Sequence, residues 1–182
     1  MRKALALLLV LSFLVVPAVN ADPPKPSLKD SITFDGQTYV LKSKASQKSV
    51  TRNEYILESE TLKTWTKMIS VRHFPNLKDK TQVIADLAKI LKAHNPDAAY
   101  AKFLNKDKTA EGIDFITWQG DKFAEFNIMI YRDSPDGKGL VAQQFAMRAY
   151  GKDMIPFLRR LPELRREFFP KVTEYKFPTI IE

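Results

Sequence analysis

The chain has 182 residues, contains no cysteine and carries a formal net charge of +8 at pH 7. The lack of cysteine excludes disulfides, thiol nucleophiles, cysteine-bound metals and thiol redox chemistry. The positive charge is compatible with contact to nucleic acid, anionic lipid or an acidic protein. A charge spread over the surface to keep the protein in solution explains the same number.

The first residues have the pattern of a secretory signal peptide. Residues 1–3 form a basic head, residues 4–16 are uniformly apolar, and residues 19–21 are small enough for signal peptidase. The apolar run is shorter than the roughly 20 residues that span a bilayer, which disfavours a membrane anchor. We therefore expect cleavage after Ala21 and export to a bacterial periplasm or out of the cell, where nucleic acid is not an expected partner.

The rest of the chain has the size of one domain. Residues 22–30 contain three prolines and two lysines, which predicts a flexible leader. Residues 31–170 are expected to form a single domain, and residues 171–182 a C-terminal tail.

The first part of the domain has the residue types of strands. The turn pair Asp35-Gly36 predicts a hairpin, because these residues adopt the positive φ angles of a type I′ turn. A short helical turn is expected at residues 62–67. The strands are predicted at residues 31–34, 37–41, 50–57 and 68–74.

The strongest helical pattern covers residues 80–94. Asp79 is a plausible N-cap, and Asn95-Pro96 ends the pattern. The apolar residues recur at helical spacing and should lie on a sheet. They are Val83, Ile84, Leu87, Ile90 and Leu91.

The second part of the domain predicts a strand at residues 98–104 and then a three-stranded antiparallel meander. Its strands are expected at residues 112–118, 123–132 and 140–150, separated by Gly-, Pro- and Asp-containing turns. A second helix is expected from residue 153 to 168, kinked or split by Pro162. This element order predicts an α+β fold: a largely antiparallel sheet with one long helix and a C-terminal helix packed on it.

Alternation along residues 123–132 separates two faces of the central meander strand. The even-numbered side chains Ala124, Phe126, Ile128 and Ile130 are apolar, whereas the odd-numbered face mixes polar and aromatic groups. We expect the even-numbered face to lie beneath helix 80–94 and the odd-numbered face to look away from that helix.

The mixed faces of the meander supply the candidate site. If they coincide, they form one polar–aromatic surface, in which Arg148 would hold an anion or pair with Glu125. The alternative is a solvated sheet face with ordinary cross-strand pairs. The candidate ligand- or partner-binding residues are Asp114, Trp118, Glu125, Asn127, Tyr131, Gln144, Arg148 and Tyr150.

No catalytic, cofactor or metal motif is present in the sequence. His73 and His94 lack a partner at metal-ligand spacing, and there is no phosphate loop, Gly-x-Ser-x-Gly or His-Glu-x-x-His. Asp114 and Glu125 are carboxylates capable of acid–base work, but nothing in the sequence brings them together. We therefore expect no cofactor, no metal and no catalytic residue.

The last helix combines an apolar side with a basic one. Its arginines would suit an anionic membrane or an acidic partner. The competing interpretation is a surface helix that docks through its apolar side, and Pro162 favours that interpretation because it interrupts a membrane-lying face. The arginines are Arg159, Arg160, Arg165 and Arg166.

The element order over residues 31–168 resembles that of the PsbP-like α/β sandwich group. The resemblance rests on the opening hairpin, on Asn53-Glu54-Tyr55 followed by Leu62-Lys63-Thr64-Trp65, on the long helix and on the meander. It implies a compact exported binding or accessory domain, often without catalysis. It carries no site motif, so it implies no functional residue, and the lack of cysteine departs from lipid-anchored relatives.

These observations favour an exported, non-enzymatic binding or accessory domain. It would be a monomer that binds a protein or small ligand through the open sheet face, and changing Arg148 or Trp118 would weaken binding without loss of stability. One alternative is a secreted inhibitor or immunity protein directed against an effector. Another is a hydrolase of an unrecognised type.

Overall fold

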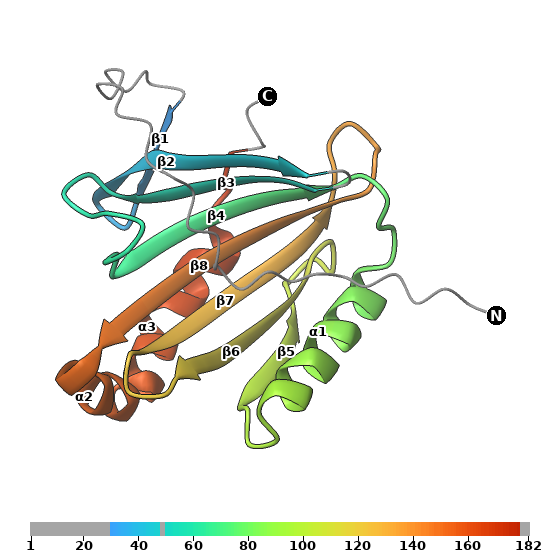
Figure 1. Cartoon of the computed structure of the whole chain (residues 1–182). Helices are drawn as coiled ribbons and strands as arrows, with labels where there is room; N and C mark the ends of the chain where they lie inside the picture. Colours follow the sequence, from blue (N-terminus) through green and yellow to red (C-terminus); the bar gives the residue numbers. More distant parts are fainter. Residues whose placement is uncertain (1–29, 48–49, 179–182) are drawn as a thin grey trace.

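The computed structural model describes residues 30–47 and 50–178. The predicted signal peptide and nearly all of the predicted leader lie outside the described residues. The described chain forms one eight-stranded antiparallel sheet with the strand order β1-β2-β3-β4-β8-β7-β6-β5 (Figure 1). The fold is therefore α+β, as predicted.

The boundaries of the elements follow the sequence pattern closely. The strands are β1 (Ser31–Phe34), β2 (Gln37–Gln47), β3 (Val50–Leu57), β4 (Lys67–Phe74), β5 (Tyr100–Leu104), β6 (Glu111–Gln119), β7 (Phe123–Asp133) and β8 (Leu140–Tyr150). The helices are α1 (Lys80–His94), α2 (Met154–Arg159) and α3 (Leu161–Glu174). No helix within these described residues is long and apolar enough to cross a membrane.

The sheet consists of two sequence-local parts joined by one long-range pairing. β1 to β4 form an antiparallel run, and β5 to β8 form another that contains the predicted meander. The two parts meet where β4 pairs with β8, with Ser70 opposite Gln144. This pairing makes β8 a central strand, buried along most of its length.

Helix α1 confirms the predicted helix 80–94. The Asp79 side chain accepts a hydrogen bond from Gln82 N at 3.0 Å, which satisfies one free amide of the first turn. At the other end Asn95 adopts an extended conformation while its N–H still bonds to Leu91 O. The predicted apolar stripe is buried at Val83, Ile84, Leu87 and Leu91.

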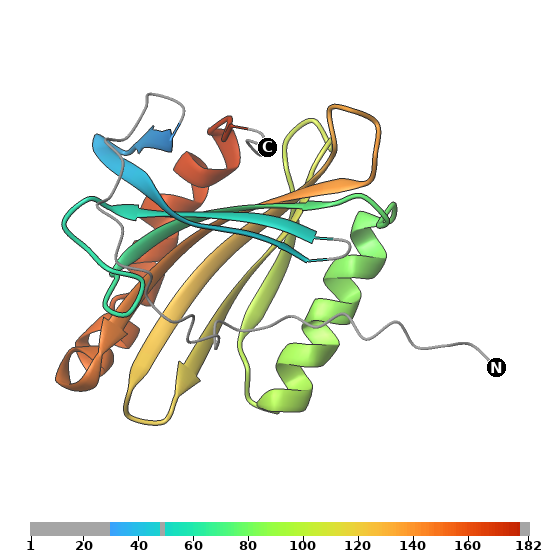
Figure 2. The ribbon, with the colours of Figure 1, turned by 45° about the horizontal axis from the view of Figure 1, so that its top comes forward.

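The two main helices cover opposite faces of the sheet (Figures 1 and 2). The α1 face carries Met129 and Tyr131 of β7, which pack with Leu87. The α3 face carries Phe126 and Ile128 of β7, which pack with α3. The prediction that the even-numbered side chains lie beneath α1 is therefore wrong.

The reason for this exchange is the size of the two apolar surfaces. The α3 face meets a large group of apolar side chains from α3 and the residues after it, namely Leu164, Phe168, Val172 and Phe177. The fully apolar even-numbered side of β7 is buried there, because that side offers the larger area to remove from water. The narrower apolar stripe of α1 covers only Met129 and Tyr131 on the odd-numbered side of β7.

Three local predictions also change. The helix predicted at residues 62–67 is absent from the described structure: residues 62–64 form a turn, and β4 already begins at Lys67. The C-terminal helix breaks at Arg160, and Pro162 stands in the first turn of α3, where its missing N–H costs nothing. Helix α3 continues through Glu174, so the predicted tail from residue 171 begins too early.

Candidate functional site

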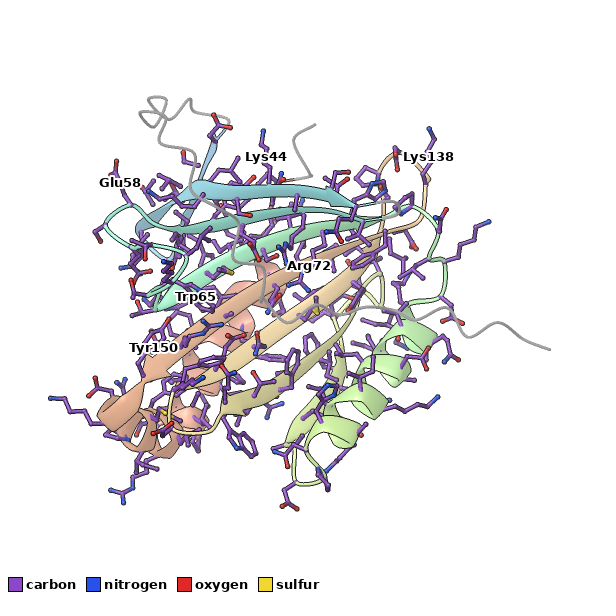
Figure 3. All side chains as sticks on the ribbon, viewed as in Figure 1. Lys44, Glu58, Trp65, Arg72, Lys138 and Tyr150 are labelled. Carbon is purple, nitrogen blue, oxygen red and sulfur yellow. The ribbon has the colours of Figure 1, made fainter. Side chains whose placement is uncertain are left out.

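Helix α1 covers only part of its face of the sheet. It packs over β6 and the adjoining ends of β7 and β8, through partners such as Ile113, Met129 and Leu140. Over β3, β4 and the middle of β8, the described part of the chain places no helix on this side (Figure 1). We call this region the open face. Figure 3 shows Arg72, Trp65 and Tyr150 along it.

A group of polar side chains lies across four strands of the open face. Glu54 of β3 is opposite Ser70 of β4, and Ser70 is opposite Gln144 of β8. Gln144 Nε2 donates to Asn127 Oδ1 of β7 at 2.5 Å, and Arg72 Nη2 donates to Gln144 Oε1 at 2.8 Å. We call these five residues the polar cluster.

The hydrogen bonding of the polar cluster is incomplete. Ser70 Oγ, Arg72 Nε and Asn127 Nδ2 are buried, and no described residue offers any of them a partner. Ser70 is 0% exposed and Asn127 is 1% exposed. Buried polar atoms in proteins nearly always have a partner, so three neighbouring exceptions require an explanation.

The charge of this region is also unbalanced. Arg52 Nε lies 3.4 Å from Glu54 Oε1, whereas the hydrogen bond from Arg72 goes to the neutral amide of Gln144. Two guanidinium groups thus face one carboxylate. Burial lowers the pKa of the Arg72 guanidinium, an effect that the nearby Tyr131 and Glu54 oppose.

Tyr131 stays a neutral group beside this cluster. Burial raises the pKa of the Tyr131 hydroxyl to about 12, and the Arg72 guanidinium acts in the opposite direction. The hydroxyl donates to Met129 Sδ at 3.2 Å, a weak acceptor. Tyr131 therefore contributes no negative charge that would neutralise Arg72.

A second arrangement on the same face surrounds Arg148. Its guanidinium carbon lies 4.0 Å from the centroid of the Trp65 ring and 4.1 Å from that of Phe123. Arg148 Nε donates to Glu125 Oε2 at 2.9 Å, and Tyr150 Oη donates to Trp65 O at 2.8 Å. We call these five residues the aromatic clamp.

The geometry of the aromatic clamp decides between the two roles predicted for Arg148, which were binding an anion and pairing with Glu125. Its side chain is 11% exposed and that of Glu125 is 10% exposed, so the ion pair is shielded from water. Removing one member of such a pair leaves an unpaired buried charge. Arg148 therefore pairs with Glu125, and the expectation that it can be changed without loss of stability does not fit this geometry.

The structure brings six of the eight predicted site residues to one face. These are Glu125, Asn127, Tyr131, Gln144, Arg148 and Tyr150. Asp114 and Trp118 point the other way, because they are opposite Ile128 and Ala124 on β7. The single predicted surface is thus wrong for these two residues.

Asp114 has a separate role on the α3 face. Its carboxylate accepts from Arg165 Nε at 2.9 Å, and Arg165 belongs to α3. Burial raises the pKa of the Asp114 carboxyl, while Arg165 lowers it. Asp114 and Glu125 lie on opposite sides of the sheet, so they cannot act together on one substrate.

Sequence reasoning missed the residues contributed by β3 and β4. Glu54, Ser70 and Arg72 reach the site only because β4 pairs with β8, a pairing between segments far apart in the chain. The alternation of β4 places Ser70 and Arg72 on the same face as Met68. A serine and an arginine inside a strand of otherwise apolar character were the available signal.

The remaining candidate groups are occupied locally. His73 Nε2 donates to Lys138 O at 2.7 Å, and His94 Nδ1 donates to Ile90 O at 3.0 Å. Arg160 lies 3.7 Å from Glu163 on α3. In residues 30–47 and 50–178, no group of three His, Asp or Glu side chains is arranged to hold a metal ion.

Comparison with known proteins identifies a family without a described function. One uncharacterised family matches residues 26–177. The chain belongs to this family. The structure shows a fold with helices and a large antiparallel sheet, and the match itself names no PsbP-like relationship. No curated protein and no solved structure matches the chain.

Proposed function

We propose that the protein is an exported binding domain that holds an anionic oxygen group of its ligand against the polar cluster. The observation that carries this proposal is the set of buried groups without a partner: Ser70 Oγ, Arg72 Nε and Asn127 Nδ2. Two of them are obligatory donors and the hydroxyl can donate. A group with several acceptor oxygens satisfies all three.

Energetics favour an acceptor that is charged. A buried donor without a partner costs about 1–3 kcal/mol, and more where the donor is charged. Among the described residues Arg72 has no carboxylate partner, because Glu54 on the neighbouring strand β3 lies against Arg52. Hydrogen bonds between a guanidinium and an anionic oxygen are about twice as strong as neutral ones. A carboxylate or phosphate group therefore suits the site better than a neutral carbonyl.

Binding without catalysis is the version of this proposal that the geometry favours. The Glu125 carboxylate is held by Arg148 in the aromatic clamp, and Asp114 lies on the other side of the sheet. Neither carboxylate is placed to activate a water molecule at Arg72. Export as a monomer with a PsbP-like accessory role is part of the same proposal, based on the signal pattern of residues 1–21 and the element order.

The test uses small oxyanions as probes. Acetate, citrate and inorganic phosphate are titrated at constant ionic strength, with chloride as the reference salt, into ¹⁵N-labelled protein. We expect at least one probe to shift the Arg72 Nε–H and the Asn127 side-chain amide resonances saturably. If no probe shifts these resonances more than chloride does, the proposal is refuted.

A matched pair of variants separates contact from general charge. Arg72→Met and Arg52→Met each remove one positive charge from the same face. Both Nε atoms are buried without a hydrogen-bond partner among the described residues, but Arg52 forms an ion pair with Glu54, whereas Arg72 bonds to the neutral amide of Gln144. We expect Arg72→Met to weaken the binding of the active probe about tenfold or more, the equivalent of one charge-assisted hydrogen bond. Arg52→Met should change it about threefold or less. Equal losses in both variants would show that only the overall charge matters.

A further inference from the structure

A second site candidate lies at the C-terminal end of α1. A cavity of about 370 Å³ separates the last turn of α1, at Ile90, Leu91 and His94, from residues 116–118 of β6. Cavities that bind small molecules measure about 300–1,000 Å³, and an apolar cavity of about 150 Å³ accommodates benzene. The space therefore suits a ligand of one or two rings.

The cavity exists because β5 is shorter than β6. The pairing of these strands ends with Tyr100 opposite Phe115, and a single further bond joins Ile116 N to Ala99 O. Beyond that point no described residue pairs with this edge of β6. Trp118 stands on it with 47% of its surface exposed, an unusual position for an indole ring.

Two polar side-chain atoms at the cavity, Thr117 Oγ1 and His94 Nε2, have no hydrogen-bond partner among the described residues. Thr117 Oγ1 is buried, and the structure's described residues give it no partner. His94 Nδ1 donates to Ile90 O at 3.0 Å, which leaves Nε2 as the ring nitrogen that makes no hydrogen bond to the described residues. The remaining walls include Leu91 and Ala98, which are buried and apolar.

The charge at this position disfavours an anion. The end of α1 presents the negative end of the helix dipole, equivalent to about half an elementary charge. The polar cluster differs, because Arg72 within it and Arg52 beside it share the single carboxylate of Glu54 among the described residues nearby. The two sites share one sheet, since Thr117 is opposite Glu125, but they select different ligands.

We propose that this cavity binds a small, neutral, planar ring compound that carries one hydroxyl group. The ring lies against Ile90 and Leu91 of α1 and against the edge of β6, where Trp118 lines the cavity although its register places it on the α3 face. The hydroxyl group bonds to Thr117 Oγ1 or His94 Nε2. The proposal is independent of the proposed function, because no residue of the polar cluster lines this cavity.

The probe is 2-naphthol, followed by NMR of the tryptophan indole groups. The sequence contains only Trp65 and Trp118, so two indole N–H signals are expected and Trp65→Phe assigns them. We expect 2-naphthol to shift the Trp118 signal saturably and to leave the Trp65 signal in place. An unshifted Trp118 signal at millimolar 2-naphthol would overturn the proposal.

Charge and contact are tested separately by calorimetry. The anion 2-naphthoate, with the same rings, should bind at least about tenfold more weakly than 2-naphthol. Trp118→Ala should weaken 2-naphthol binding about tenfold, and Thr117→Val should weaken it about threefold to tenfold because the shape is kept and the hydroxyl lost. Leu104→Ala, at an exposed apolar position on β5, is the control and should have no effect.

Two outcomes of these titrations would contradict the assignment. Equal binding of 2-naphthol and 2-naphthoate would refute the neutral ligand class. Undiminished binding to Trp118→Ala would place the probe elsewhere. Arg72→Met should leave 2-naphthol binding unchanged, so the two ligand sites succeed or fail independently.

Discussion

Replacing Ser70 by alanine is predicted to stabilise the domain. Ser70 is 0% exposed between Glu54 on one side and Gln144 on the other. Its hydroxyl is buried, and among the described residues it has no partner. The substitution therefore removes a buried polar atom without breaking a hydrogen bond, which is an unusual situation for a serine inside a sheet.

The expected size follows from two opposing contributions. Burying a hydroxyl without a partner costs about 1–3 kcal/mol in measured proteins. Losing the contacts of one oxygen atom in a packed interior offsets part of that gain. We expect Ser70→Ala to raise the free energy of unfolding by about 1 kcal/mol, which corresponds to a rise in Tm of about 2–4 °C for a domain near this size.

Urea denaturation of the ligand-free protein measures this effect, and Ser134→Ala is its control. Ser134 is also buried, but its Oγ donates to Asp136 Oδ1 at 2.5 Å. The same substitution should there lower the free energy of unfolding by about 1 kcal/mol. If Ser70→Ala destabilises the protein as much as Ser134→Ala does, the Ser70 hydroxyl has a partner such as an ordered water. The reasoning behind the polar cluster would then be wrong.

Three further predictions concern the elements that hold the site. Glu125→Gln should lower the free energy of unfolding by about 3 kcal/mol, because it leaves the Arg148 charge buried and unpaired, and Glu125→Gln/Arg148→Met should recover part of that loss in urea titrations. Burial raises the pKa of the Asp114 carboxyl above its usual 3.8. The wild-type protein should therefore lose stability relative to Asp114→Asn as the pH rises from 3.8 through the folded-state pKa. A difference in stability that does not change with pH would contradict this. Gly139→Ala should cost about 3 kcal/mol or more, since φ is +79° and the new Cβ would lie 2.0 Å from a backbone carbonyl oxygen. Gly137→Ala, at a φ of +73° with open space around it, should cost only about 1–2 kcal/mol.

The parts of the fold that depend on neighbours in sequence were predictable. Asp35-Gly36 marks its hairpin, and the stripe from Val83 to Leu91 gives α1 with its cap at Asp79. The meander follows from turn residues between strand-forming runs. Each of these patterns lies within one helix or one pair of neighbouring strands.

The position of Asp114 and Trp118 was also encoded, in the length of a turn. Between β6 and β7 the chain turns so that Gln119 is opposite Phe123, which pairs even-numbered residues with even-numbered ones. Both residues must then share a face with Ile128. Their polar and aromatic character suggested the other face, but a register shift of one residue would have moved Ile113 and Phe115 from the α1 face to the α3 face.

The pairing of β4 with β8 was not predictable from local pattern. Ser70 and Gln144 are opposite each other although α1, β5, β6 and β7 lie between them in sequence. No local pattern in residues 67–74 indicates which strand they pair with. The candidate site was therefore found only in the half contributed by the meander, and its most informative atoms, on Ser70 and Arg72, came from the structure.

The pairing of β4 with β8 joins the two halves of the sheet, β1 to β4 and β5 to β8. Ser70 and Arg72 stand on one side of it, and Asn127 and Gln144 on the other. Closure of such a distant pairing is expected to be late and slow. A ligand bound to residues of both halves would stabilise the pairing of β4 with β8. Its release would make this pairing the first part of the sheet to open.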